Sequence, residues 1–322
     1  MNSINNVIID GLSFALPLFI MAIGGIYSER SGVTNLALEG LQGMGAFTGA
    51  LAAYIIGLQV SADSQLPYYC AFLFAVLGGM VYSLLHAVLC IRFKANQVIS
   101  GVVINILAMA LTVFLTKTLN RNVFGAASDK IMLGVSDRLT VPGISQIPVL
   151  GAFFTNVYPF EIIIVALAFF AWYLLYRTRF GLHLRACGDN PHAVDAAGVD
   201  VARTRYLAVM MSGALSGLAG MAFAYSISAK FSADIYVGYG YLAIAALIFG
   251  NWKITPTLFA CLIFGFARSG GYQLVQYLGM PSSYSDLVMI LPYVLTLFLL
   301  IFFSKHNQAP KALGEIYDKS KR

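Results

Sequence analysis

The sequence predicts an all-α polytopic membrane protein, with about 8–10 transmembrane helices in a single domain spanning residues 1–322. Of its 322 residues, 59% are hydrophobic and only 11% are charged, whereas soluble domains are about 25% charged. Apolar stretches near the roughly 20 residues needed to cross a hydrocarbon core recur along the whole chain. No part of it has the composition of a separate soluble domain.

Apolar runs bounded by charged residues, proline or glycine mark nine segments, at residues 7–27, 34–57, 68–91, 98–119, 159–176, 206–228, 241–250, 254–269 and 286–303. The first segment follows neither a basic stretch nor a signal-peptide cleavage site, so we expect it to remain in the mature protein. The 241–250 run is about half the length of a spanning helix. It is either a broken or re-entrant element, or part of a longer segment through Asn251–Lys253.

Lysine and arginine accumulate in short cytoplasmic loops, so their positions predict orientation. An outside N-terminus leaves six of the twenty on the outer side: Lys117, Arg121, Lys130, Arg138, Lys230 and Arg268. The other fourteen then face the cytoplasm: Arg30, Arg92, Lys94, Arg177, Arg179, Arg185, Arg203, Arg205, Lys253, Lys305, Lys311, Lys319, Lys321 and Arg322. We therefore expect residues 120–158 outside, and the 177–205 loop and the 304–322 tail inside.

The two halves of the chain carry a short internal echo. The heptapeptide Asn35–Leu41 (NLALEGL) resembles Tyr241–Leu247 (YLAIAAL). Related halves with interrupted helices are common in transporters, where unwound backbone lies beside a cavity. A match of seven apolar positions also arises by chance, and both interpretations stay open.

Several kinds of chemistry have no basis in the sequence. The four cysteines, Cys70, Cys90, Cys187 and Cys261, form neither a CxxC pair nor a Cys/His cluster, which argues against a metal site or a disulfide framework. No phosphate-binding G-x-x-x-x-G-K-[ST] motif occurs, so the chain should not hydrolyse ATP itself. The net charge of +6 follows from topology rather than from a nucleic-acid partner.

Polar residues within apolar segments are costly in lipid, and are therefore candidates for a translocation pathway. Four residues are candidates: Asn35, Glu39, Gln42 and Asn105. Hydrogen bonding between helices would use the same residue types. For Glu39 we weigh a contact with a substrate hydroxyl against a structural pairing with Arg30, and favour the pairing. His86 is a weaker candidate, because a neutral imidazole can simply bond across helices.

Small residues one helical turn apart allow close approach of helices in lipid. Such rows occur at Gly45/Gly49, Gly213/Gly217 and Ser212/Ser216/Gly220. We interpret them as packing positions rather than substrate contacts.

The 177–205 loop contains a short helix signature. Asn190 can cap a helix that begins at Pro191, because proline at the first position wastes no N–H group. Gly198 can end that helix, and Ala193, Ala196 and Ala197 are small enough for a close contact. This pattern suits docking onto a cytoplasmic protein, although composition alone favours an ordinary cytoplasmic loop with topology-setting arginines.

The residues just described resemble those of a known family. The loop Gly188–Gly198 (GDNPHAVDAAG), followed by the small-residue helix Ser212–Gly220, resembles the coupling region of ABC-importer permeases for branched-chain amino acids, simple sugars and nucleosides. Residues Gly24–Gly40 (GGIYSERSGVTNLALEG) resemble the nucleoside-type branch. With Ile248–Gly250, the likeness extends from about residue 11 to residue 303.

The resemblance implies a type II importer fold in a bacterial cytoplasmic membrane, with this chain as the shorter of two permease subunits. Its implied partners are a second permease, a cytoplasmic ATPase that binds ATP and Mg²⁺, and an external substrate-binding lipoprotein. The ATPase-coupling residues carried over are Asn190, Pro191, Ala193, Ala196, Ala197 and Gly198. A nucleoside is the first substrate expected, with simple sugars, riboflavin and branched-chain amino acids as alternatives.

Two other classes of protein compete with this interpretation. An ion-coupled secondary transporter needs ionisable groups near the membrane midplane, and only Glu39 and His86 approach that requirement. A membrane-embedded enzyme would need a nucleophile–base pair or a metal cluster, and the sequence shows no pattern for either.

Overall fold

A computed structural model of the chain describes residues 2–61, 63–134, 136–147, 149–234, 237–281, 283–303 and 308–319. Its first half contains α1 (Asn2–Arg30), α2 (Leu38–Gly57), α3 (Leu66–Ala87) with the π-helical turn η1 (Val88–Arg92), and α4 (Gln97–Asn122). A long connection holds β1 (Ile131–Met132), η2 (Ile144–Gln146) and η3 (Leu150–Phe154). The second half contains α5 (Pro159–Arg177), α6 (Arg179–Asp189), α7 (Pro191–Ala196), α8 (Val201–Ile227), β2 (Lys230–Phe231), α9 (Tyr239–Phe249), α10 (Ile254–Tyr277), α11 (Ser283–Val288) and α12 (Leu291–Phe303).

The all-α class is confirmed, and each of the nine expected apolar segments contains a helix. Six helices in the described residues are long and apolar enough to cross a membrane: Ile4–Arg30, Leu66–Arg92, Gln97–Asn122, Pro159–Arg177, Val201–Ile227 and Ile254–Tyr277. The 20-residue α2 also has about the length of a crossing.

Three of the expected apolar segments differ from a single continuous helix. The 241–250 run is a separate short helix, the 11-residue α9, so the broken-element alternative is confirmed. The expected segment 34–57 begins too early, because residues 31–37 are not helical and α2 starts at Leu38. The Asn35 side chain explains this late start, since its Oδ1 accepts the Ala37 N–H at 3.0 Å and competes with helical bonding. The 286–303 segment is divided between α11 and α12.

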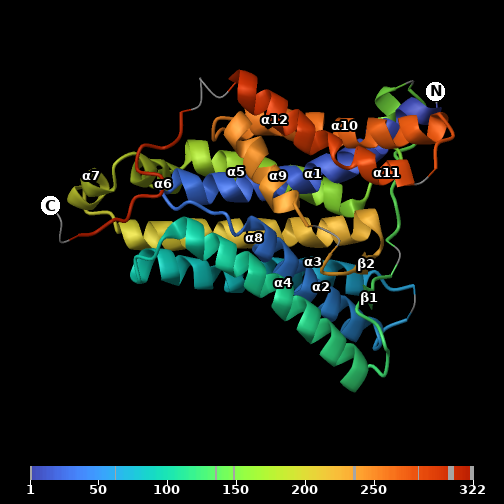
Figure 1. Cartoon of the computed structure of the whole chain (residues 1–322), viewed down its shortest axis with the longest axis horizontal. Helices are drawn as coiled ribbons and strands as arrows, with labels where there is room; N and C mark the ends of the chain where they lie inside the picture. The colour runs from blue at the N-terminus through green and yellow to red at the C-terminus, as the bar shows by residue number, and fades with distance from the viewer. Residues whose placement is uncertain are drawn as a thin grey trace.

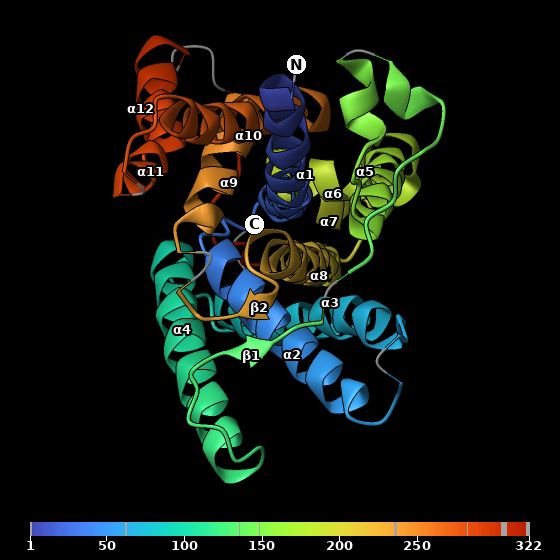
Figure 2. The same cartoon turned by 90° about the vertical axis from the view of Figure 1, so that its right-hand side faces the viewer.

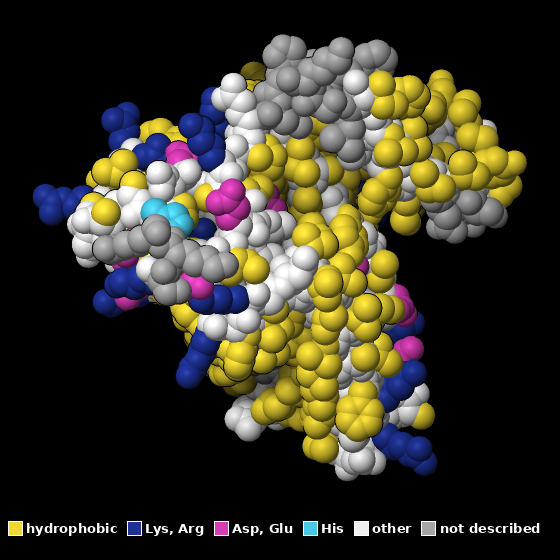
Figure 3. Space-filling model, turned by 60° about the vertical axis from the view of Figure 1, so that its left-hand side comes forward, with side chains coloured by type: hydrophobic (Ala, Val, Ile, Leu, Met, Phe, Trp, Pro, Cys, Tyr) yellow, Lys and Arg dark blue, Asp and Glu magenta, His cyan; other side chains and the backbone are white. Residues whose placement is uncertain are grey.

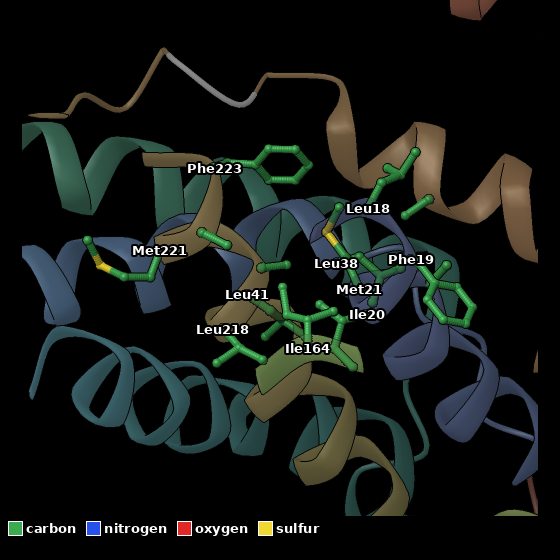
Figure 4. Packing of buried hydrophobic residues seen from close by; sticks show 14 of the residues in the cluster. Leu18, Phe19, Ile20, Met21, Leu38, Leu41, Ile164, Leu218, Met221 and Phe223 are labelled. Atoms are coloured by element: carbon green, nitrogen blue, oxygen red, sulfur yellow. The ribbon is translucent and has the colours of Figure 1, made fainter. Parts of the chain in front are cut away.

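Helix α8 lies at the centre of the fold. It packs against α1 on one side and against α2 and α3 on the other (Figures 1 and 2). Large apolar side chains fill the space between these helices, including Met21 of α1, Leu38 and Leu41 of α2, and Leu218 of α8 (Figure 4).

Glycines set the closest of these contacts. A Cβ atom on Gly217 of α8 would lie within 3.0 Å of the Ala75 carbonyl oxygen of α3, and one on Gly45 would meet Gly217 itself. Added Cβ atoms on Gly49 and Gly213 would likewise strike backbone oxygens of α3. The small-residue rows therefore serve helix packing, as predicted.

The chain has two distinct ends. At one, the pair β1–β2 links the 120–158 connection to the loop after α8, with Ile131 opposite Phe231. At the other lie α6, α7 and the C-terminal residues, on the left of Figure 1, while the N-terminus lies on the right. In the tail, residues 304–307 and 320–322 lie outside the described residues.

Candidate functional site

Two interrupted helices meet in the interior at their N-termini. Glu39 stands in the first turn of α2, and its Oε2 accepts the Gly238 N–H at the start of α9, at 2.7 Å. The Gly240 N–H also bonds to this carboxylate. A carboxylate is favourable there, because the first N–H groups of a helix have no partner within the helix.

The expected pairing of Glu39 with Arg30 is wrong. The Arg30 Nε donates instead to the Trp252 carbonyl at 3.0 Å. The partner of Glu39 is the N-terminus of α9 rather than an arginine. The late start of α2 places Glu39 in its first turn, nine residues beyond Arg30 at the end of α1 and within hydrogen-bond distance of Gly238.

Asn105 of α4 completes the junction. Its Oδ1 accepts the Gly40 N–H at 2.7 Å, and its Nδ2 donates to the Leu36 carbonyl at 2.8 Å. The same Nδ2 lies 3.4 Å from the Tyr241 hydroxyl of α9. Asn105 thus ties the unwound backbone before α2 to α4 and α9, and satisfies polar groups that lipid cannot.

A cavity of about 160 Å³ opens beside this junction. Glu39 and Asn105 line it together with Thr112 and Tyr241 on one side of the molecule, and its remaining wall is mostly apolar or glycine. Unwound backbone, a carboxylate and an amide beside a cavity form the arrangement that transporters use at a pathway.

The other two pathway candidates do not reach this cavity. Asn35 is fully buried, and its Nδ2 donates to the Ser212 hydroxyl of α8 at 2.9 Å. Gln42 is also fully buried, and neither atom of its amide has a hydrogen-bond partner among the described residues. The structure therefore brings together Glu39 and Asn105, and places Asn35 and Gln42 inside the helix packing.

Two buried carboxyl groups were not among the predicted residues. Glu29 of α1 accepts the Trp252 indole N–H at 2.5 Å, and Glu161 of α5 accepts the Ser13 hydroxyl at 2.6 Å. Both are at most 5% exposed. Their position near the ends of apolar helices was the available signal, because an ionisable residue within a span rarely lacks a role.

The 177–205 loop is not irregular, since it contains both α6 and α7. The predicted start of α7 is confirmed: Asn190 Oδ1 accepts the Ala193 N–H at 3.1 Å, and Pro191 is the first helical residue. Gly198 follows the helix with φ of +81°, a left-handed conformation that favours glycine.

Helix α7 has one inward and one outward face. Pro191 and Val194 are buried, and Val194 packs with Cys187 of α6 and Val201 of α8. Ala193, Ala196, Ala197 and Gly198 are exposed, together with the capping Asn190. The outward face therefore carries the small side chains of Ala193, Ala196 and Ala197 beside the exposed His192, and of the predicted coupling residues only Pro191 is buried.

The C-terminal segment secures this region. The Ala312 N–H donates to the Gly188 carbonyl of α6 at 2.8 Å, and the Gly314 N–H donates to the Gly32 carbonyl after α1 at 3.1 Å. The ring of Tyr317 packs on the inward cluster beneath α7. Three separate elements are thus joined at the end that carries α7.

Basic residues gather at this same end, as the space-filling view shows around α6 and α7 (Figure 3). Members of the two groups of the charge count lie at opposite ends of the described structure: Lys94 pairs with Asp318 of the tail, whereas Arg138 and Arg268 line a cavity near the start of α1. Lys305, Lys321 and Arg322 lie outside the described residues.

Comparison with known proteins adds the remaining findings. Residues 7–300 match the family model described as branched-chain amino acid transport system / permease component. The chain is 40% identical to the guanosine ABC transporter permease protein NupQ of Bacillus subtilis, over 97% of this chain and 96% of the relative. It is 35% identical to the nucleoside ABC transporter permease protein NupC of Lactococcus lactis, over 99% of both.

A third relative carries a different printed substrate. The chain is 31% identical to the putative glucose ABC transporter permease protein TsgC13 of Haloferax volcanii, over 78% of this chain and 72% of the relative. No solved structure matches the chain.

Proposed function

The chain belongs to the family of permease components of the branched-chain amino acid transport system, and from this premise we propose that it carries a nucleoside into the cell as part of an ABC importer. The subunit itself is non-catalytic. The observation that supports a nucleoside as the substrate is full-length similarity, at 35–40% identity, to two permeases named for guanosine and for nucleosides.

The proposed pathway passes the α2–α9 junction. Its cavity of about 160 Å³ is smaller than the roughly 300–1,000 Å³ of ligand pockets. A second permease facing this side supplies the missing wall, so the pathway runs between two subunits. Glu39 and Asn105 then present a carboxylate and an amide, which can bond the hydroxyl groups and base edges of a nucleoside.

The proposed coupling element is α7. Its outward face of Ala193, Ala196 and Ala197 has no long side chain to hinder close packing against an ATPase groove. Its inward face is held by Val194 and by the tail. A displacement of α7 by the ATPase would therefore be transmitted through the hydrogen bonds that join Gly188 and Gly32 to the tail. Gly32 begins the non-helical segment that leads to Glu39.

The remaining partners follow from the same proposal. ATP and Mg²⁺ bind to the separate ATPase. A substrate-binding lipoprotein docks on the opposite end, at the 120–158 connection. In this proposal the chain lies in the bacterial cytoplasmic membrane, with α7 on the cytoplasmic side.

The test is uptake by the complete importer, reconstituted in vesicles with its ATPase, second permease and binding protein. We expect labelled guanosine to enter in an ATP-dependent way, unlabelled nucleosides to compete, and glucose, riboflavin and leucine to have no effect. Competition by glucose but not by nucleosides would assign the chain to the simple-sugar branch and refute the proposed substrate.

A further inference from the structure

A basic cavity of about 520 Å³ lies where α5 and α10 meet the end that carries α6. Its four ionisable residues other than tyrosine are all cationic, and no carboxylate lines it: Arg30, Arg177, Arg185 and Lys253. The remaining walls are Trp172, Tyr176, Thr255 and Pro256. We propose that this cavity binds the phosphate headgroup of an anionic phospholipid.

The cationic groups have few protein partners. Among the described residues, none of the four forms an ion pair with a carboxylate, whereas Lys94 and Lys319 at the same end pair with Asp318 and Asp195. The Asp189 charge acts on Arg30, but Asp189 does not line the cavity. Arg30 and Arg185 are close enough for their charges to repel one another. An added anion relieves that repulsion.

Two of the guanidinium groups are positioned by aromatic rings. Arg177 lies over Trp172, with its Cζ 5.8 Å from the ring centroid, and Arg185 lies over Tyr176 at 5.5 Å. Such stacking holds the planar guanidinium while leaving its Nη groups available to phosphate oxygens; the Arg185 Nε donates to the Gly181 carbonyl at 3.2 Å. The start of α10 adds the positive end of a helix dipole at Thr255 and Pro256.

A second observation separates a lipid from a soluble phosphate. The rings of Phe169, Trp172 and Tyr176 form a continuous row along α5, with successive centroids 6.0 Å apart. This row leads from the cavity into the apolar span, where Phe169 is 69% exposed. It offers an acyl chain an apolar surface directly below the bound headgroup, at the depth where tryptophan and tyrosine favour the membrane interface.

The predicted membrane side of the cavity agrees with an anionic phospholipid as its ligand. The charge count assigns this end to the cytoplasm, and the cytoplasmic leaflet carries anionic lipids that basic clusters between helices bind. The Tyr176 hydroxyl accepts the Ile254 N–H at 3.3 Å, so the cavity joins α5 to the start of α10. A lipid bound there braces α5, α1 and α10 against one another.

The test uses the full chain in a nonionic detergent and native mass spectrometry. Dioleoyl phosphatidylglycerol is titrated against dioleoyl phosphatidylcholine, which has the same acyl chains. We expect at least tenfold tighter binding of the anionic lipid. The variants Arg177→Gln, Arg185→Gln and Lys253→Gln should each reduce that preference by about fivefold, equivalent to about 1 kcal/mol per charge.

The matched control removes two exposed cations from the far end of α4, as Lys117→Gln with Arg121→Gln. This control should retain the full lipid preference. An equal loss in the control would show that the preference is general electrostatic attraction and overturn the site.

Two further arms separate other ligands. Stabilisation of the chain by inorganic phosphate as strong as that by phosphatidylglycerol would identify a soluble phosphate site and refute the lipid. Loss of ATPase association in the Gln variants, with an unchanged lipid preference, would identify a protein contact and also refute it. Neither arm depends on the transported substrate, so failure here is distinct from failure of the nucleoside proposal.

Discussion

Replacing Gly217 by alanine tests the helix packing at the centre of the fold. The new Cβ would lie within 3.0 Å of the Ala75 carbonyl oxygen, a separation that real Cβ atoms essentially never show. Because this neighbour is backbone, α3 and α8 must separate by on the order of 1 Å to restore van der Waals contact. Overpacking of this kind costs about 1–3 kcal/mol, and larger side chains such as leucine should cost more.

The chain provides its own control. Gly270 lies within α10, and a Cβ there meets nothing within 4 Å. Alanine is otherwise preferred to glycine in a helix by up to about 1 kcal/mol. Gly270→Ala should therefore be neutral or slightly stabilising, and the difference between the two variants isolates the contact with Ala75.

The assay is thermal unfolding in detergent, followed by a maleimide dye that reacts with thiols as they become exposed. Cys90, Cys187 and Cys261 are buried in the fold and report unfolding. By the scaling of about 2–4 °C per kcal/mol for domains of 150–250 residues, Gly217→Ala should lower the midpoint by about 2–12 °C. Equal midpoints for Gly217→Ala and the wild type would refute the packing argument, as would an equal loss in Gly270→Ala.

Three further predictions follow. Ala197→Arg should abolish ATPase co-purification and uptake while leaving the thermal midpoint unchanged, because a long charged side chain cannot be accommodated in a close contact. Charge reversal at Arg203 should have a milder effect, since an exposed charge pair is worth under about 1 kcal/mol. Normal assembly of Ala197→Arg would show that α7 is not the coupling element. In a cysteine-free background, an impermeant reagent should label a cysteine at position 129 but not one at position 192 in intact cells, and labelling at 192 would reverse the orientation. Glu39→Gln should lower the midpoint and uptake together, because a neutral amide is a weaker acceptor than a carboxylate for the N–H groups of Gly238 and Gly240 and loses the interaction with the positive end of α9. The expected cost is about 1–3 kcal/mol, and a wild-type midpoint would contradict the capping role.

Local chemistry explains why α7 was predictable. Asn190, Pro191 and Gly198 act within a few residues of one another, through capping, a fixed φ and a left-handed φ. Those preferences do not depend on the rest of the chain. The coupling role proposed for the outward face rests instead on the likeness of its motif to known permeases.

Glu39 shows where such reasoning stops. The sequence indicated a costly carboxylate near Arg30 and predicted an ion pair between neighbours in the chain. The partners observed are the N–H groups of Gly238 and Gly240, some two hundred residues away. Nothing in the local pattern of either segment specifies that the two helix N-termini face each other.

The sequence by itself determined the membrane class, the approximate positions of the apolar helices and the packing role of the glycine rows, because lipid imposes length and apolarity on each span separately. For the 241–250 run it left two alternatives, and the structure decided for the short α9. Only the tertiary structure decided which polar residues share a cavity. Asn35, Gln42, Glu39 and Asn105 are all polar residues within apolar segments, and the sequence does not distinguish their positions. In the structure, Asn35 and Gln42 lie inside the helix packing, whereas Glu39 and Asn105 line the cavity. The direction in which each side chain points depends on the rotation of its helix against its neighbours, and that rotation is fixed by contacts between segments distant in the chain.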